Sequence, residues 1–171
     1  MFNGNIIIFG DSIAAWNPRK DFVNNGVPGM TTNNLYFNLK KYNFSNRNND
    51  IAIIVCGVND ILLSIDEKLI YENICFIVKK FYEHFYKVIF VSLLPTDSEK
   101  LNKNIVKLNE MLKMSLQDKF LDMYRYFLAN RLNTIDNIYT TDGIHLGNLG
   151  YKKFNEILDL KLEKIKNPTF L

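Results

Sequence analysis

The chain has 171 residues, a length that one folded unit accommodates, so we expect a single domain spanning residues 1–171. Apolar residues make up 47% of the sequence and charged residues 23%, which is typical of a globular protein and excludes a disordered or fibrous chain. The net charge of +3 comes from scattered rather than clustered lysines, so we expect no nucleic-acid partner.

The N-terminal segment predicts the first strand of a buried sheet. Residues 5–9 (NIIIF) form the continuous apolar run that a strand covered on both faces requires. The run is too short for a membrane span and no basic segment precedes it, so we expect no stable membrane insertion and a cytoplasmic location, with export left open. Residues 21–24 (DFVN) predict a weaker second strand, and Thr31 or Thr32 can cap the helix that follows.

Short apolar runs continue to alternate with helical patterns along the rest of the chain. Further strands are predicted at 51–56 (IAIIVC), 87–94 (KVIFVSLL) and 120–123 (FLDM). Ser64 and Glu67 match a capping box, which predicts the start of a helix. Apolar spacing predicts a stripe from 70 to 85 in that helix, a further helix over 101–112 and a last one over 148–165.

Strands separated by helices predict a parallel sheet with right-handed crossovers. We therefore expect an α/β fold, a three-layer α/β/α sandwich of the flavodoxin-like kind with about five parallel strands. Ligands bind beyond the carboxyl ends of the strands in such a sheet. The loops expected there are Gly10-Asp11-Ser12, residues 24–29 and residues 57–60. If the first strand lies between the second and third, Ser12, Gly29 and Asn59 converge in one crevice.

Ser12 is a candidate nucleophile, and a hydroxyl needs a base to take its proton. The chain has two histidines. His84 lies in a helical pattern and is expected at the surface or rim. His145 follows Asp142 by three residues in a loop, so the carboxylate can reach Nδ1, fix the tautomer and leave Nε2 as the base. A simple turn after the first strand and a helix-capping loop around His145 are the alternatives that these residues leave open.

An acyl-transfer reaction also needs donors for the oxyanion of its tetrahedral intermediate. The candidates are the backbone N–H groups of Ser12 and Gly29 and the side-chain amide of Asn59. Asp11 and Asp60 only accept hydrogen bonds when ionised, so we expect them to cap helices and brace loops.

No metal or cofactor is expected. Cys56 and Cys75 lack His or Cys partners at zinc-ligand spacing, so both are predicted to be free, buried thiols. Asp142 and His145 likewise have no third ligand nearby in the sequence.

Four stretches together resemble the SGNH (GDSL-type) hydrolases. They are GDS at Gly10-Asp11-Ser12, GVPGMTT around Gly29, the GxND pattern at 57–60 and the DxxH pattern from Asp142 to His145. The run VIFVSLLP, the helix that carries Asn109 and the closing DGIHLGNLGYKKF extend the resemblance over nearly the whole chain. The resemblance implies that Ser12, Gly29, Asn59 and His145 are the name-giving residues, with Asp142 completing a triad. Ile13 replaces the usual Leu, and Pro28 and Met30 flank Gly29 in place of commoner small or acidic residues.

The resemblance implies a serine esterase that works through an acyl-enzyme on a small-molecule ester. The chain leaves no room for a large lid, which favours short acyl groups, acetyl above all. The absence of an amphipathic membrane helix from the pattern favours a carbohydrate alcohol over a lipid. Trp16 and Met30 are candidate substrate-binding residues, with simple packing as the alternative for Trp16. Other readings are a lysophospholipase or thioesterase, an acyltransferase with the same triad, and a non-catalytic binding module.

Overall fold

The centre of the fold is a five-stranded parallel sheet with the strand order β2-β1-β3-β4-β5. The structure, a computed structural model, describes residues 2–129 and 133–167. The strands are β1 (Ile6–Gly10), β2 (Phe22–Gly26), β3 (Ile51–Val55), β4 (Lys87–Val91) and β5 (Phe120–Leu121). This order is that of a flavodoxin-like sheet, in which the chain reverses direction across the sheet between β1 and β3.

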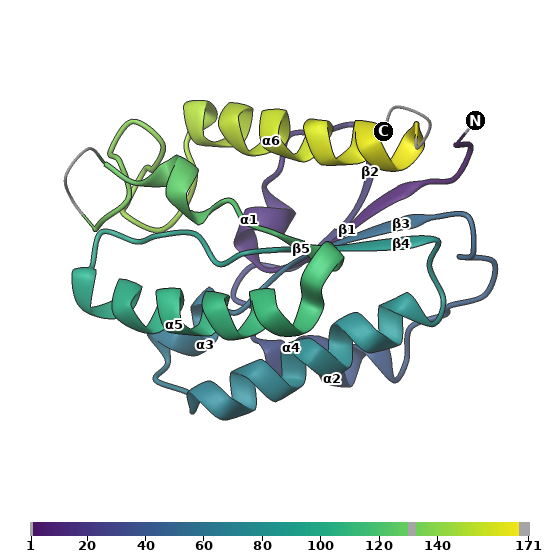
Figure 1. The fold of residues 1–171 in the computed structure, drawn as a ribbon, viewed down its shortest axis with the longest axis horizontal. Helices are drawn as coiled ribbons and strands as arrows, with labels where there is room; N and C mark the ends of the chain where they lie inside the picture. The colour runs from purple at the N-terminus through teal and green to yellow at the C-terminus, as the bar shows by residue number, and fades with distance from the viewer. Residues whose placement is uncertain (1, 130–132, 168–171) are drawn as a thin grey trace.

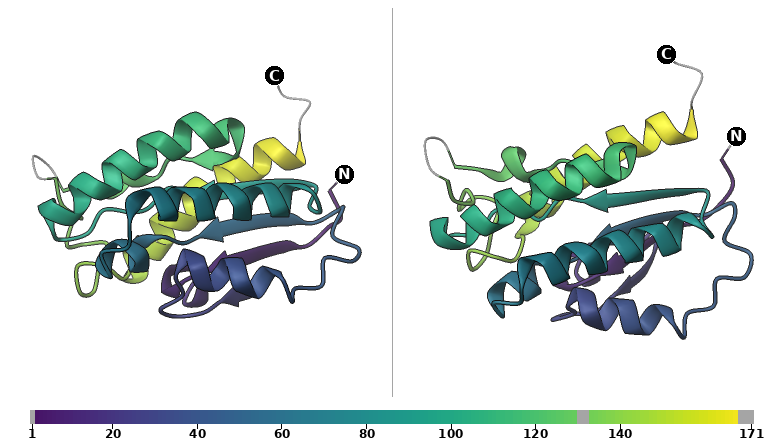
Figure 2. Two further views of the ribbon diagram at one scale, coloured as in Figure 1. Left: turned by 90° about the horizontal axis from the view of Figure 1, so that it is seen from below. Right: turned by 60° about the horizontal axis from the view of Figure 1, so that its bottom comes forward.

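Helices cover both faces of the sheet, which confirms the three-layer sandwich (Figures 1 and 2). The α-helices are α1 (Ser12–Ala15), α2 (Thr32–Leu39), α3 (Val58–Leu62), α4 (Glu67–Tyr82), α5 (Glu99–Leu116) and α6 (Asn148–Lys166). Two 3₁₀ turns, η1 (Gln117–Lys119) and η2 (Tyr124–Phe127), flank β5. Helices α1 and α6 pack on one face of the sheet, and α2 to α5 pack on the other.

Alternation along the central strands separates two hydrophobic cores. In β1, Ile7 and Phe9 point into the core under α2, α4 and α5, whereas Ile6 and Ile8 point into the core under α6. All five residues of β3 are buried in the same alternating way. Complete burial of one such side chain contributes about 1.5–3 kcal/mol, so these runs fix both the strand register and the two helical layers.

The helix starts agree with the sequence analysis at one position and differ at another. Thr31 caps α2 as predicted, because its side chain accepts a hydrogen bond from the backbone of Asn34. The prediction of a capping box from Ser64 to Glu67 is wrong. The N-cap of α4 is Asp66, whose carboxylate accepts from Leu69, while Ser64 has φ +56° and closes the turn after α3. A capping side chain needs an extended backbone, which Ser64 lacks.

Several strand ends also differ from the predicted ones. Strand β2 runs to Gly26, so the loop that follows it is shorter than residues 24–29. Strand β4 ends at Val91 rather than 94, because the side chain of Asn109 occupies both the N–H and the carbonyl oxygen of Leu93, each at 2.9 Å. The fifth strand has two residues instead of four, and α3 forms in a segment that was expected to be a loop.

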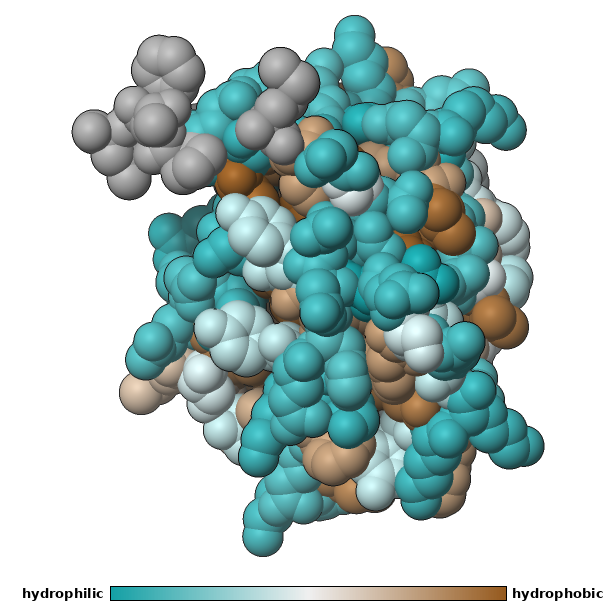
Figure 3. Space-filling model, turned by 90° about the vertical axis from the view of Figure 1, so that its right-hand side faces the viewer, coloured by the Kyte–Doolittle hydropathy of each residue, from teal (hydrophilic) through white to brown (hydrophobic). Residues whose placement is uncertain are grey.

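The molecular surface carries few extended apolar areas on the side where β1 begins and α6 ends. Figure 3 shows that face as mostly hydrophilic, with apolar residues scattered across it. Within residues 2–129 and 133–167, no helix combines the length and the apolar composition needed to cross a membrane.

The backbone at Gly10 lies very close to the end of β3. A β-carbon at this position would lie 1.7 Å from the carbonyl oxygen of Val55, and φ is +138°. Gly10→Ala should therefore lower the free energy of unfolding by about 3 kcal/mol or more, measured by urea denaturation. Gly147→Ala is the control, because its nearest neighbour would lie at 3.5 Å, and it should cost less than about 1 kcal/mol. Equal stability of the two variants would contradict the role of Gly10.

Candidate active site

The candidate site lies at the carboxyl ends of β1, β2 and β3. Because β1 lies between β2 and β3, the loops that carry Ser12, Gly29 and Asn59 leave adjacent strands, as the sequence analysis required. The backbone of Asp11 donates to Val55 at 3.0 Å, and that of Val27 donates to Gly10 at 2.8 Å. These bonds hold all three loops against the end of β1.

Ser12 is the first residue of α1 and is 4% exposed. Asp11 is the N-cap, and its Oδ1 accepts from the backbone of Ile13 at 2.9 Å. The N–H of Ser12 therefore lies in the first turn, where no intrahelical partner exists, and points out of the helix end. On the other side, the buried hydroxyl of Tyr151 in α6 donates to the carbonyl oxygen of Ile13 at 3.2 Å. Helix α1, which begins at Ser12, is thus held in place by the N-cap Asp11 at its start and by Tyr151 of α6.

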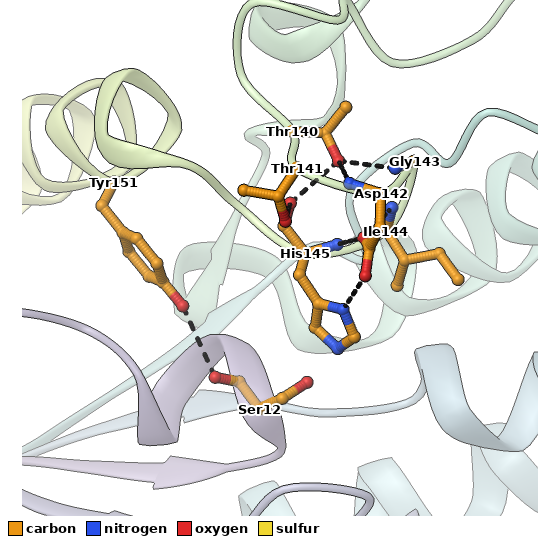
Figure 4. A network of polar contacts seen from close by, with 8 residues as sticks. All are labelled: Ser12, Thr140, Thr141, Asp142, Gly143, Ile144, His145 and Tyr151. Atoms are coloured by element: carbon orange, nitrogen blue, oxygen red, sulfur yellow. Dashed lines mark hydrogen bonds and ion pairs between the residues drawn. The ribbon is translucent and has the colours of Figure 1, made fainter.

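Asp142 and His145 form a charge-assisted pair. Oδ2 of Asp142 lies 2.6 Å from Nδ1 of His145, and Oδ1 accepts from the backbone of His145 at 2.7 Å. These bonds lower the pKa of Asp142 to about 2. An ionised carboxylate places the proton on Nδ1 and leaves Nε2 able to accept one. Figure 4 shows the imidazole above Ser12, with that free nitrogen on the side of the serine hydroxyl.

The hydroxyl of Thr140 holds the turn that carries this pair. It donates to the carbonyl oxygen of His145 at 2.8 Å and accepts from the backbone of Gly143 at 2.9 Å (Figure 4). Gly143 has φ +88°, a conformation that favours glycine. Sequence reasoning missed Thr140. Its only signal was the Thr-rich, Gly-containing composition of the loop.

The three predicted oxyanion donors belong to the loops that follow β1, β2 and β3. Gly29 has φ +76°, and no heavy atom lies within 4 Å of the point where a β-carbon would stand. In the described part of the chain, the backbone N–H groups of Ser12 and Gly29 have no acceptor. Asn59 Nδ2 donates one hydrogen to the carbonyl oxygen of Met30 at 3.0 Å, which orients the amide and leaves its second hydrogen available.

A buried carboxyl group joins two of the donor loops. Asp60 is 1% exposed and accepts from the backbone of Thr32 at 2.9 Å and from its hydroxyl at 2.7 Å. Burial raises the pKa of Asp60 above its ordinary value, and the bonds to Thr32 oppose that shift. The hydrogen bonds of Asp11 and Asp60 confirm that these carboxylates cap a helix and brace a loop.

A small apolar cavity of about 20 Å³ is lined by the two chain neighbours of Ser12, but not by Ser12 itself. Its walls include Asp11, Ile13, Val58, Leu93 and Ile144. A space of this size holds one water molecule or a group of similar bulk. Sequence reasoning gave no sign of this cavity, because its walls come from loops that follow three different strands and from the Asp142–His145 turn.

Of the two predicted substrate-binding residues, only Trp16 lies at the mouth of this site. Its ring centroid lies 4.7 Å from that of His145 at an interplanar angle of 51°, and it is 51% exposed. Met30 is 7% exposed and packs in the core under α2 and α4. Its carbonyl oxygen orients Asn59, but its side chain is not available at the mouth.

Other predicted features lie away from the site. Cys56 is a buried free thiol at the end of β3, whereas Cys75 is only partly buried. His84 stacks on Phe44 at a centroid distance of 4.4 Å, at the rim of the core as expected. Among residues 2–129 and 133–167, no three His, Cys, Asp or Glu side chains are grouped as metal ligands.

Comparison with models of known families gives one match. Residues 6–153 match the model of the GDSL-like lipase/acylhydrolase family. The chain belongs to this family. No curated protein matches the sequence significantly.

Solved structures share the fold of this GDSL-like acylhydrolase at low sequence identity. A GDSL-like lipase from Bacteroides thetaiotaomicron is 18% identical with a TM-score of 0.79, over 94% of this chain and 88% of that one. A lipolytic G-D-S-L family protein from Veillonella parvula is 20% identical with a TM-score of 0.77, over 99% and 100%. A catalytic mutant of an acetylxylan esterase from Geobacillus stearothermophilus is 12% identical with a TM-score of 0.77, over 95% and 96%.

Burial of Asp11 makes the stability of this acylhydrolase depend on pH. Loss of hydration raises the pKa of Asp11 from 3.8 to about 7. Between these values the folded protein retains a proton that the unfolded chain has released, so this carboxyl lowers the free energy of unfolding as pH rises from 4 to 7. Asn caps helices about as well as Asp and carries no charge. The stability of Asp11→Asn relative to the wild type should therefore increase over this range by up to about 4 kcal/mol, or about three pKa units at 1.36 kcal/mol each.

Urea denaturation at pH 4.5 and pH 8 measures this difference. Asp21→Asn is the control, because the pKa of this exposed carboxyl is lowered by Arg19 rather than raised by burial. A stability difference between Asp11→Asn and the wild type that stays constant with pH would contradict the assignment.

Proposed function

We propose that the protein hydrolyses short-chain acyl esters, O-acetyl esters above all, through an acyl-enzyme on Ser12. The observation that carries this proposal is the 2.6 Å contact between Asp142 and His145, which leaves Nε2 free on the side of the Ser12 hydroxyl. Membership of the acylhydrolase family supports the reaction type.

Ser12, His145 and Asp142 have distinct roles in the proposed acylation. The Ser12 oxygen attacks the acyl carbon while Nε2 of His145 takes the hydroxyl proton. Asp142 stabilises the imidazolium that forms. The carbonyl oxygen becomes an oxyanion and receives hydrogen bonds from the backbone of Ser12 and Gly29 and from the Asn59 amide. Collapse of the intermediate breaks the bond to the alcohol oxygen, which takes the proton from His145.

Deacylation repeats these steps with water as the nucleophile. His145 takes a proton from the water molecule, whose oxygen attacks the acyl carbon of the acyl-enzyme. When the second intermediate collapses, the Ser12 oxygen leaves and regains its proton from His145. The net reaction consumes one ester and one water molecule and releases one acid and one alcohol.

The small size of the cavity beside the loops of Ser12 and His145 supports an acetyl group as the acyl half. Ile13 and Ile144, the chain neighbours of Ser12 and His145, line a space of about 20 Å³, which is room for about one water molecule. A longer acyl chain would have to displace Leu93, which Asn109 holds by its backbone, or lie outside the cavity. The acetylxylan esterase among the structures of similar fold is consistent with a carbohydrate acetate as substrate.

A series of p-nitrophenyl esters from acetate to decanoate tests the proposed function. We expect the highest kcat/KM for acetate and a fall of about 10-fold for each of the first added methylenes, because the cavity rejects added volume. Ser12→Ala and His145→Ala should lower kcat by about 10³- to 10⁶-fold and leave the circular dichroism spectrum unchanged. Ser115→Ala, an exposed serine on α5, is the control and should keep full activity. Activity that survives in Ser12→Ala, or that rises with chain length, would refute the proposal.

In the proposed mechanism, the side-chain amide of Asn59 donates to the oxyanion. Asn59→Ala should lower kcat by about 10²- to 10³-fold, near 3 kcal/mol, with little change in KM, because the amide stabilises the oxyanion rather than the bound ester. Asn38→Ala, an exposed asparagine on α2, should leave both constants unchanged. An unchanged kcat for Asn59→Ala on p-nitrophenyl acetate would exclude this side chain from the oxyanion hole.

A further inference from the structure

Lysine and arginine residues that are scattered along the sequence gather at one end of the folded molecule. The helices run antiparallel to the strands, so the last turns of α2, α4 and α6 lie beside the starts of the strands (Figure 1). We call this part the basic end. It comprises residues 2–5, 40–50, 79–87, 117–119 and 161–167. The candidate site lies at the opposite end, where the strands finish.

The basic end carries a large excess of positive charge. It contains ten of the 21 lysine and arginine residues and four of the 18 acidic residues, which leaves 11 and 14 for the rest of the chain. Lysines such as Lys79 and Lys80 in the last turn of α4 complement the helix dipole. That effect does not account for Arg47 in a loop or for Lys87 at the start of a strand. A charge separated in this way orients the molecule toward a negatively charged partner.

Exposed aromatic rings lie among these lysines. Phe37 is 51% exposed and Tyr82 is 56% exposed. The ammonium group of Lys40 lies 4.7 Å from the centre of the Phe37 ring, and that of Lys119 lies 4.4 Å from the centre of the Tyr82 ring. Two more pairs have the same arrangement: Lys87 with Tyr86 at 5.9 Å, and Lys166 with Phe2 at 5.8 Å.

A lysine beside an exposed ring is a combination that an anionic bilayer surface binds. Aromatic rings settle at the level of the lipid headgroups, and a lysine stem lies along apolar surface while its ammonium group reaches the phosphates. Each lysine near such a surface strengthens binding about 5-fold. Figure 3 looks onto the basic end and shows hydrophilic side chains standing out from it, with apolar residues between them.

The same surface is less suited to a nucleic acid or to a stable protein partner. Bases of a single strand stack on open aromatic faces, whereas the ammonium groups of Lys40 and Lys119 occupy faces of Phe37 and Tyr82. A stable protein interface has a continuous apolar centre. The apolar residues of this end are instead scattered across it (Figure 3).

We propose that the basic end binds the surface of a bilayer rich in anionic phospholipids. The contact is peripheral and consists of lysine ammonium groups and the rings beside them. Because the candidate site lies at the other end of the strands, the bound protein presents that site to the water rather than to the lipid. The inference does not depend on the reaction proposed for Ser12.

Co-sedimentation with vesicles measures this binding. The wild type should bind vesicles of equal parts phosphatidylglycerol and phosphatidylcholine at least about 10-fold more strongly than vesicles of phosphatidylcholine alone. The difference should shrink as salt is added, because the attraction is electrostatic. Equal binding to both vesicles, or binding to neither, would overturn the proposal.

Matched pairs of substitutions locate the contact. Lys40→Gln combined with Lys87→Gln removes two exposed lysines of the basic end and should weaken binding to the anionic vesicles about 25-fold. Lys68→Gln combined with Lys100→Gln is the control, because it removes the same charge from exposed positions at the starts of α4 and α5. The control should weaken binding by less than about 3-fold. Equal losses in the two variants would show that net charge, rather than the basic end, determines binding.

Competition separates a lipid surface from a nucleic acid. Poly(U) added at the same phosphate concentration as the lipid should leave the protein on the vesicles. Phe37→Ala keeps the charge and removes one ring, so it should weaken vesicle binding about 3-fold or more. Release of the protein by poly(U), or unchanged vesicle binding by Phe37→Ala, would overturn the proposal.

Trp16 reports the orientation of the bound protein. It is the single tryptophan of the chain and packs beside His145 at 4.7 Å, so it lies at the end away from the proposed contact. Anionic vesicles that contain brominated lipid quench only tryptophans at the bilayer. They should therefore bind the protein without lowering its emission. Quenching of Trp16 on binding would place the candidate site against the lipid and overturn the proposal.

Discussion

The candidate site depends on how the backbone leaves β1. Gly10 brings the chain into contact with the end of β3, where a β-carbon would overlap the carbonyl oxygen of Val55. The backbone of Asp11 then donates to that same oxygen, and α1 begins at Ser12. This contact places the nucleophile candidate at the boundary between β1 and β3, so the loop that carries Asn59 starts beside it. The polar loops after β1, β2 and β3 therefore converge at one edge of the sheet.

Two buried carboxyl groups keep that convergence rigid. Asp11 and Asp60 are each 1% exposed, and loss of hydration raises the pKa of both. Their burial costs stability, yet each one occupies backbone donors that would otherwise remain unpaired at the start of α1 or α2. Donors that are fixed before the substrate arrives stabilise a developing oxyanion without further reorganisation. The unfavourable burial of these groups therefore serves the geometry of the site.

The sequence was sufficient to predict the three layers of the fold and to identify the candidate catalytic residues. Continuous apolar runs at β1 and β3 predicted a sheet covered on both faces, and the polar loops after them identified Ser12 and Asn59. The spacing of Asp142 and His145 in one loop predicted their contact, which is local and depends little on the rest of the fold. Each of these features is encoded within a few consecutive residues.

Features that depend on contacts between distant segments could not be predicted in this way. Ser64 matched a capping pattern, but a short helix just before it imposes a left-handed backbone there, and Asp66 takes the cap. The early end of β4 follows from a side chain of α5, and the small cavity beside Ile144 is closed by residues from four loops. Met30 flanks Gly29 in the sequence, yet its side chain turns into the core while Trp16 stays at the mouth. The direction of neither side chain can be predicted from the local composition of the sequence.

Covalent labelling of the nucleophile tests the central role of Ser12 most directly. A p-nitrophenyl alkylphosphonate reacts with an activated serine hydroxyl and forms a stable adduct that resembles the tetrahedral intermediate. Mass spectrometry of the digested protein should find one phosphonyl group per chain, on the peptide that contains Ser12, and His145→Ala should abolish the rapid labelling while the protein remains folded. Labelling at another residue, or at an unchanged rate in His145→Ala, would contradict the assignment of Ser12 and His145 as nucleophile and base.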